Sequence, residues 1–99
     1  PQPVTVGGKP ITNPDIAFTK AVKVQGFKFD PETNIVPLGT TVTWTNYDSV
    51  PHTITSNDGF FASKTLNTGD KFSFKFTKKG TFFYHCTFHP DMLGRIIVQ

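Results

Sequence analysis

The sequence of 99 residues predicts an all-β fold, a Greek-key β-sandwich of about seven or eight strands. Three observations support this fold class. Apolar and polar residues alternate over short stretches, clusters of Gly, Pro, Asn and Asp separate these stretches, and no stretch shows the apolar period of a helix. The 11 phenylalanines must mostly be buried, because each covers on the order of 150–250 Å². Such an aromatic core compensates for the absence of an internal disulfide, which a single cysteine cannot form.

The expected elements form one domain, residues 1–99. Residues 1–20, which begin with a stretch rich in Pro, Gly and Thr, are expected to form an N-terminal arm or an extra edge strand. Gly26 interrupts an alternating stretch, which predicts a strand with a β-bulge at the glycine. Val42 and Trp44 share a face of the clearest strand. The predicted strands, each an alternating or β-prone stretch, are 21–29, 40–45, 52–55, 70–77, 81–86 and 95–98.

Residues 84–92 carry the chemistry of the chain, because they include its only cysteine and its only methionine. Copper that changes oxidation state favours a thiolate, imidazole nitrogens and a weak, more distant thioether. Cys86, His89 and Met92 offer one of each. The sequence therefore predicts three of the four ligands of a copper site in this stretch.

The second histidine ligand follows from strand geometry. Successive side chains of a strand point to opposite faces, so His85 is expected to face away from Cys86. His52 remains, and Pro51 before it stiffens the backbone that presents it. Each of these residues taken singly is more often a core or surface residue, but their joint spacing favours a metal site.

The run 80–95 resembles the copper-binding end of a cupredoxin, a type 1 blue copper protein. Two residues separate Cys86 from His89 and two separate His89 from Met92, and this short spacing is most similar to that of the amicyanins. Plastocyanins and pseudoazurins have a longer gap between the histidine and the methionine. The resemblance covers about residues 21–99, and it implies a cupredoxin-like sandwich, one mononuclear type 1 copper and a periplasmic or otherwise extracytoplasmic location.

The resemblance also implies roles for residues around the ligands. Thr53 is expected to donate its backbone N–H to the Cys86 sulfur, and Asn46 is expected to support the same site. Phe88 stands where amicyanins commonly have proline, so it is expected to add a second N–H···S bond that raises the reduction potential. The docking surface for a redox partner is expected to consist of Pro51, Phe60, Phe88, Pro90 and Asp91.

The expected function is that of a soluble carrier that cycles copper between Cu(II) and Cu(I) and shuttles single electrons between proteins. The partners would be transient ones such as a dehydrogenase, a cytochrome or a copper oxidase. Four protein ligands leave no open position for a substrate, which argues against an enzyme. Two alternatives stay open: copper storage or delivery, which requires an exchangeable site, and an electron-relay domain of a larger copper oxidase, which requires a catalytic centre on another polypeptide.

Composition excludes other classes of function. The net charge is +3, and the lysines are scattered rather than interleaved with arginine and aromatic residues, so nucleic-acid binding is not expected. No run approaches the roughly 18 apolar residues that a membrane-spanning helix needs. A monomer is expected.

Overall fold

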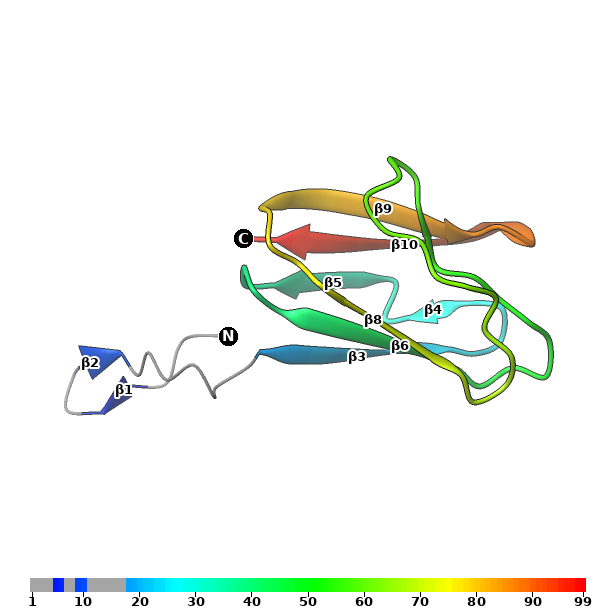
Figure 1. Ribbon diagram of the computed structural model, residues 1–99, viewed down its shortest axis with the longest axis horizontal. Coiled ribbons are helices and arrows are strands. Elements are labelled where there is room, and N and C mark those ends of the chain that lie inside the picture. Colours follow the sequence, from blue (N-terminus) through cyan, green and yellow to red (C-terminus); the bar gives the residue numbers. More distant parts are fainter. Residues whose placement is uncertain (1–4, 7–8, 11–17) are drawn as a thin grey trace.

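The computed structural model describes residues 5–6, 9–10 and 18–99, and within these residues it contains strands and no helix (Figure 1). Two four-stranded sheets form a sandwich. The first sheet contains, in spatial order, β4 (Phe29–Asp30), β3 (Thr19–Val24), β6 (Thr41–Asn46) and β8 (Lys71–Lys75). The second contains β5 (Thr33–Val36), β10 (His89–Val98), β9 (Gly80–Cys86) and β7 (Thr55–Ser56). The predicted all-β sandwich is confirmed.

The chain crosses between the two sheets after β4, β5, β6, β7 and β8, and each sheet contains one parallel pair, β3 with β6 and β5 with β10. A separate two-stranded sheet pairs β1 (Thr5–Val6) with β2 (Lys9–Pro10). Most of the expected N-terminal segment, residues 1–20, lies outside the described residues. Its last two residues, Thr19 and Lys20, belong to β3.

The core lies between the sheets, where the alternation of the strands buries one face of each. Val42 and Trp44 share the buried face of β6, as the sequence predicts, and both are fully buried. The Trp44 ring packs against Phe61, Phe72 and Tyr84, at centroid distances of 5.7, 5.6 and 5.4 Å. Burial of an apolar side chain of this size stabilises the fold by roughly 1.5–3 kcal/mol, so these aromatic residues hold the sandwich together without a disulfide.

The predicted bulge at Gly26 is wrong, because the chain reverses there. Gln25 and Lys28 exchange backbone hydrogen bonds of 3.0 and 3.2 Å, and β3 and β4 run antiparallel on either side. Both residues of the turn have positive φ, 66° at Gly26 and 57° at Phe27. Among two-residue hairpin turns, the type I′ turn requires positive φ at both residues, which glycine adopts freely and phenylalanine adopts at a cost of roughly 1–2 kcal/mol.

The last two strands form a longer hairpin than the sequence predicts, because β10 begins at His89 rather than at Arg95. Gly94 allows the strand to pass over the buried Tyr84 ring. A Cβ atom at this position would lie 2.4 Å from Tyr84 Cζ, so no other residue fits without displacing the ring. The hairpin is therefore tied to the aromatic core, and its tip lies at the end of the sandwich shared by the loop after β6 (Figure 1).

Candidate metal centre

The β9–β10 hairpin places Cys86 and His89 side by side. Thr87 and Phe88 form its two-residue turn, and the two residues flanking the turn are partners in the strand register. Directly opposite residues of an antiparallel pair point to the same face of the sheet. The Cys86 Sγ and His89 Nδ1 atoms accordingly lie 3.7 Å apart. The two residues between Cys86 and His89 in the motif are therefore the turn that brings these two side chains together.

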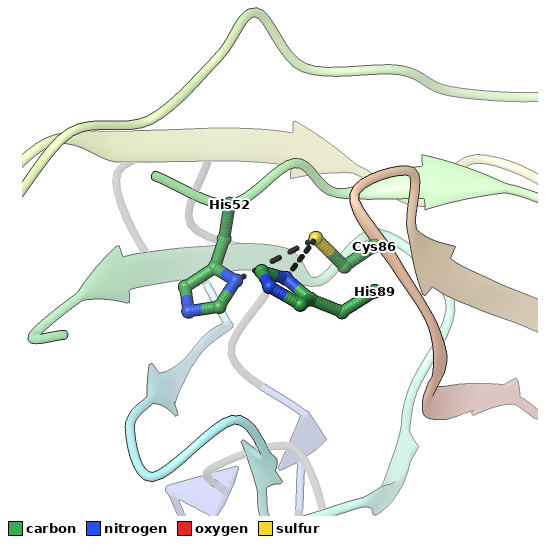
Figure 2. A group of neighbouring side chains, drawn as sticks. All are labelled: His52, Cys86 and His89. Carbon is green, nitrogen blue, oxygen red and sulfur yellow. Dashed lines mark hydrogen bonds between the residues drawn. The ribbon is translucent and has the colours of Figure 1, made fainter. Parts of the chain in front are cut away.

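His52 approaches the same point from the segment between β6 and β7. Its backbone exchanges two hydrogen bonds with Leu66, of 3.0 and 2.8 Å, and its side chain is fully buried. The predicted strand at 52–55 is thus shorter, since only Thr55 and Ser56 belong to β7. His52 Nδ1 lies 3.5 Å from Cys86 Sγ, and the three donor atoms of His52, Cys86 and His89 all lie within 4.8 Å of one another (Figure 2).

This donor set fits a trigonal copper ion. Metal bonds of about 2.0 Å to imidazole nitrogen and about 2.3 Å to thiolate sulfur, the lengths that zinc makes with these donors, would place neighbouring donors roughly 3.7 Å apart in a trigonal site. The two observed sulfur–nitrogen distances, 3.5 and 3.7 Å, agree with that separation. Two imidazoles and one thiolate are also the donors that such a site uses.

The hairpin also carries Met92 and His85. Met92 follows His89 in an irregular part of β10, where the register with β9 shifts between His89 and Leu93, and its side chain is buried. Met92 and His89 line one open pocket of about 380 Å³. His85 faces the other side of β9, where its Nδ1 atom lies 2.6 Å from Asn57 Oδ1.

Thr53 supports the sulfur and also joins the two loops of the site. Its backbone N–H donates to Cys86 Sγ at 3.4 Å, as predicted. Its hydroxyl accepts the backbone N–H of Thr87 at 2.8 Å and lies 3.0 Å from the Thr87 hydroxyl. Among residues 18–99, Thr53 is the one backbone N–H donor to the Cys86 sulfur. The predicted second N–H···S bond from Phe88 is therefore wrong. The hairpin tip is therefore oriented by the hydroxyl of Thr53 rather than by Phe88.

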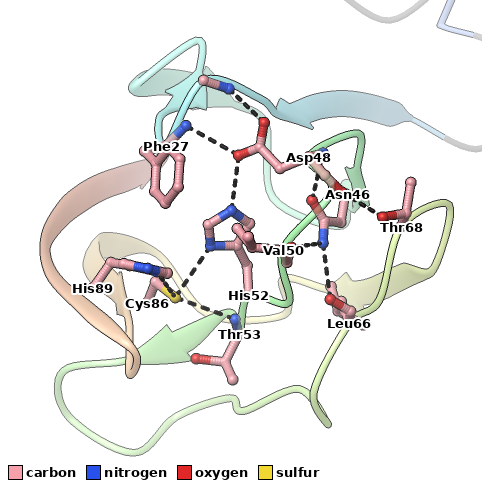
Figure 3. A network of polar contacts seen from close by, with 11 residues as sticks. Phe27, Asn46, Asp48, Val50, His52, Thr53, Leu66, Thr68, Cys86 and His89 are labelled. Carbon is pink, nitrogen blue, oxygen red and sulfur yellow. Dashed lines mark hydrogen bonds and ion pairs between the residues drawn. The ribbon is translucent and has the colours of Figure 1, made fainter.

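Asn46 holds the segment that carries His52. Its amide group donates to the carbonyl oxygens of Val50, at 3.0 Å, and Leu66, at 2.8 Å, and its side-chain oxygen accepts the N–H of Asp48 at 2.9 Å (Figure 3). Asn46 is fully buried, so water cannot reach its amide group, and these three bonds satisfy its donors and its acceptor instead. The expected supporting role of Asn46 thus has a defined set of partners.

Two residues of the site are absent from the sequence prediction, Asp48 and Phe27. The Asp48 carboxylate accepts hydrogen bonds from His52 Nε2 at 2.8 Å, from the N–H of Gly26 at 2.8 Å and from the N–H of Phe27 at 3.0 Å (Figure 3). Burial alone would raise the pKa of Asp48, but the bonds from Phe27, Gly26 and His52 together lower it, so the group is ionised at neutral pH. The one signal in the sequence is an acid four residues before His52.

Phe27 lies against both histidines. Its ring makes edge-on contacts with His52, at a centroid distance of 5.5 Å, and with His89, at 4.9 Å. About half of its surface remains exposed. The contact of Phe27 with the histidines could not be predicted from the sequence, because the sequence predicts a continuous strand with a bulge where the chain in fact reverses.

The outer surface of the site is largely apolar. Phe88 is 51% exposed at the hairpin tip, and Pro51, Pro90 and Asp91 are exposed as well. Phe60 is the exception among the expected docking residues. Its ring is partly buried and stacks on Phe82 at 4.7 Å, so it contributes to the aromatic core.

Comparison with known proteins identifies the family. Residues 12–98 match the model of the cupredoxin-like domain, which covers most of the chain. The chain belongs to the cupredoxin-like family. It is similar to amicyanin-alpha of Methylorubrum extorquens, with 34% identity over an alignment of 88 residues that covers 84% of this chain and 74% of that protein.

Solved structures support the same assignment. A purple cupredoxin from Nitrosopumilus maritimus superimposes with a TM-score of 0.76 at 37% identity, covering 81% of this chain and 99% of that one. A copper-containing nitrite reductase from Thermus scotoductus matches with a TM-score of 0.75 at 32% identity, covering 99% of this chain but 25% of the reductase chain. The cluster of Figure 2 and the similarity to amicyanin and to a cupredoxin support a type 1 copper electron carrier. Within the described residues, no helix is long and apolar enough to cross a membrane.

Proposed function

We propose that the protein carries single electrons between redox proteins through one type 1 copper ion, which His52, Cys86, His89 and Met92 would hold. The observation that carries this proposal is the convergence of one ligand atom each from His52, Cys86 and His89 within 4.8 Å of one another, with Cys86 Sγ 3.5 Å from His52 Nδ1 and 3.7 Å from His89 Nδ1. Bound copper supplies a one-electron Cu(II)/Cu(I) couple. The electron taken up comes from a reduced partner, and the electron given up goes to an oxidised one.

The residues around the site are suited to this cycle because they hold the donor atoms still. Cys86 binds as the thiolate, and the N–H of Thr53 compensates its negative charge. His52 and Cys86 are fully buried, on separate elements that are each tied by backbone hydrogen bonds. A site that barely changes shape between oxidation states exchanges electrons quickly.

His89 provides the route to the surface. It is the one partly exposed residue of the three, and the exposed side chains beside it are Phe27, Phe88 and Pro90. Transient electron-transfer partners bury small interfaces, under about 1,200 Å², and an apolar patch of this kind suits such a contact. We place the docking surface for a dehydrogenase, cytochrome or copper oxidase here, with Pro51 and Asp91 at its margin.

The alternatives fit the site less well. Copper storage or delivery requires rapid exchange of the metal, whereas His52 and Cys86 are buried. The similarity to a nitrite reductase covers only a quarter of that enzyme chain. It therefore supports a shared cupredoxin fold and gives no evidence that this chain is part of a larger oxidase. We further propose a monomer in the periplasm or another extracytoplasmic compartment, as is expected for a relative of the amicyanins.

The first test is the visible absorption spectrum after one equivalent of cupric ion is added to the purified protein. We expect an intense thiolate-to-copper charge-transfer band that disappears on reduction and is absent from a Cys86→Ser variant. A colourless product from a correctly folded protein would contradict the proposal. Loss of the band without a change in fold in Cys86→Ser would assign it to the sulfur.

A further inference from the structure

The carboxylate of Asp48 connects parts of the molecule that are otherwise separate. It lies in the loop after β6, four residues before His52, and its side chain is 13% exposed. Oδ2 lies 2.8 Å from His52 Nε2 and also accepts the N–H of Phe27, while Oδ1 accepts the N–H of Gly26 (Figure 3). One side chain thus contacts the imidazole of a proposed copper ligand and the turn between β3 and β4.

The loop that carries Asp48 is itself held firmly. Asp48 N–H donates to Asn46 Oδ1 at 2.9 Å, the Thr68 hydroxyl donates to the Asp48 carbonyl oxygen, and Tyr47 N–H donates to the Val24 carbonyl oxygen at 2.8 Å. A carboxylate on such a support has a fixed position. The carboxylate can therefore fix the positions of the His52 ring and of the turn at Gly26 and Phe27.

The first consequence concerns His52. Because Nε2 faces a carboxylate oxygen, the ring carries its proton there, and Nδ1 keeps a free lone pair directed at Cys86 Sγ, 3.5 Å away. A carboxylate bonded to the far nitrogen of a metal-binding histidine fixes its tautomer and orientation and makes it a stronger donor. The stronger donor and the nearby negative charge both favour the cupric state over the cuprous state.

The second consequence concerns His89, through Phe27. The two N–H bonds to Asp48 stabilise a turn in which Phe27 has a φ of 57°, a conformation that phenylalanine does not favour by itself. In this conformation the ring lies edge-on to His89 at 4.9 Å and to His52 at 5.5 Å. The ring covers one side of the partly exposed histidine and keeps water from it.

We propose that Asp48 is a positioning residue of the copper centre, which holds His52 through a hydrogen bond and holds the Phe27 ring against His89 through the Gly26–Phe27 turn. This inference rests on the proposed function, because it assigns a role toward a copper ion that His52 and His89 bind. It concerns the reduction potential of the carrier and the shielding of His89, which the ligand set alone does not determine.

The test uses variants that separate the two effects. Asp48→Asn removes the charge and leaves one oxygen acceptor, which cannot reproduce all three bonds. Phe27→Gly removes the ring but suits the positive φ, so the turn is retained. Asp58→Asn is the matched control, since Asp58 is another loop carboxylate that accepts a backbone N–H bond, from Phe60 at 3.0 Å, and its other side-chain partner is Ser56.

We expect opposite shifts of the reduction potential. In Asp48→Asn the potential rises, because the cupric state loses a negative charge and a strong donor. In Phe27→Gly it falls, because water at His89 stabilises the more highly charged state. In Asp58→Asn it stays at the wild-type value, and Asp48→Glu, which restores the carboxylate, returns it toward that value. An Asp48→Asn potential equal to that of the Asp58→Asn control would overturn the inference.

A second readout needs no metal. In the metal-free protein, a protected His52 Nε2–H proton should be visible by nitrogen-correlated NMR, present in Phe27→Gly and in Asp58→Asn and lost in Asp48→Ala. If Asp48→Ala kept this proton at its wild-type position and protection, the proposed bond would be refuted even if copper binds. A wild-type protein without the charge-transfer band would instead refute the proposed function, whatever the NMR result, so the two failures are distinguishable.

Discussion

The two sides of the metal centre are built in different ways although each provides a histidine. We call residues 46–53 the anchor segment and residues 86–92 the hairpin tip. The anchor segment is held both by backbone hydrogen bonds and by the buried side-chain network of Asn46 and Asp48, and its His52 is fully buried with both ring nitrogens facing partners. The hairpin tip is held by backbone pairing and by Thr53, and its His89 is partly exposed. The anchor segment thus provides the buried histidine, and the hairpin tip provides the histidine that a partner protein can approach.

The largest expected effect comes from removing each histidine in turn. Both His52→Gly and His89→Gly should lose the charge-transfer band when copper is added. Imidazole in the buffer should restore it in His89→Gly, because that position lines an open pocket of about 380 Å³. It should not do so in His52→Gly, because that site is closed to solvent. Absorption spectra of both variants with and without imidazole measure this recovery. Equal recovery of the band in both variants would contradict the difference in solvent access between His52 and His89.

The next effect concerns the stability of the anchor segment. Asn46→Ala leaves the Val50 carbonyl oxygen and the Asp48 N–H without this partner, and the Leu66 carbonyl oxygen keeps only the bond from the His52 N–H. Each buried group left unpaired costs about 1–3 kcal/mol. We expect the free energy of unfolding to fall by about 2–4 kcal/mol in urea titrations of the metal-free protein. Asn57→Ala is the control, since Asn57 is exposed and, among the residues that the structure describes, its side chain bonds only to His85. A similar loss in both variants would show that the burial of Asn46 does not matter.

Much of the site could be predicted from the sequence because it depends on local geometry. The alternation of a strand rejects His85, and a two-residue spacing places Cys86 and His89 on one face of a hairpin. Asp48 and Phe27 could not be predicted in this way. Their contact depends on how the turn after β3 meets the loop after β6, and that meeting requires a phenylalanine at positive φ, which sequence preference disfavours.

The fold shows the same division. The buried face of β6 and the partly buried face of β8 follow from alternation alone, whereas the chain reversal at Gly26 and the short β7 depend on tertiary partners. Phe60 illustrates the limit for the surface. It follows a turn close in sequence to His52, yet it stacks on Phe82 in the core. Proximity in sequence to a ligand therefore does not place a residue on the docking surface.

A smaller effect is expected where the two sides are joined. Thr53→Val keeps the shape of the side chain and the N–H bond to Cys86, but it removes the hydroxyl that accepts the N–H of Thr87. We expect the free energy of unfolding to fall by about 1–2 kcal/mol, whereas Thr53→Ser, which keeps the hydroxyl, should lose less. Urea titration of the metal-free proteins measures both. If valine and serine behaved alike, the hydroxyl would not be what joins the anchor segment to the hairpin tip.

The smallest effect on stability, and the one specific to function, is expected at the outer surface. Phe88 is 51% exposed, so Phe88→Ala should change the free energy of unfolding by no more than about 0.5 kcal/mol. Electron self-exchange between oxidised and reduced copies, measured by NMR line broadening, should nevertheless slow, because two molecules lose an apolar contact beside His89. Phe83→Ala is a matched control, since Phe83 is 50% exposed on the outer face of β9. If both variants slowed exchange equally, general surface hydrophobicity would explain the rate; if only Phe88→Ala did, electrons leave by the hairpin tip, and the exposure of His89 is what distinguishes it from His52.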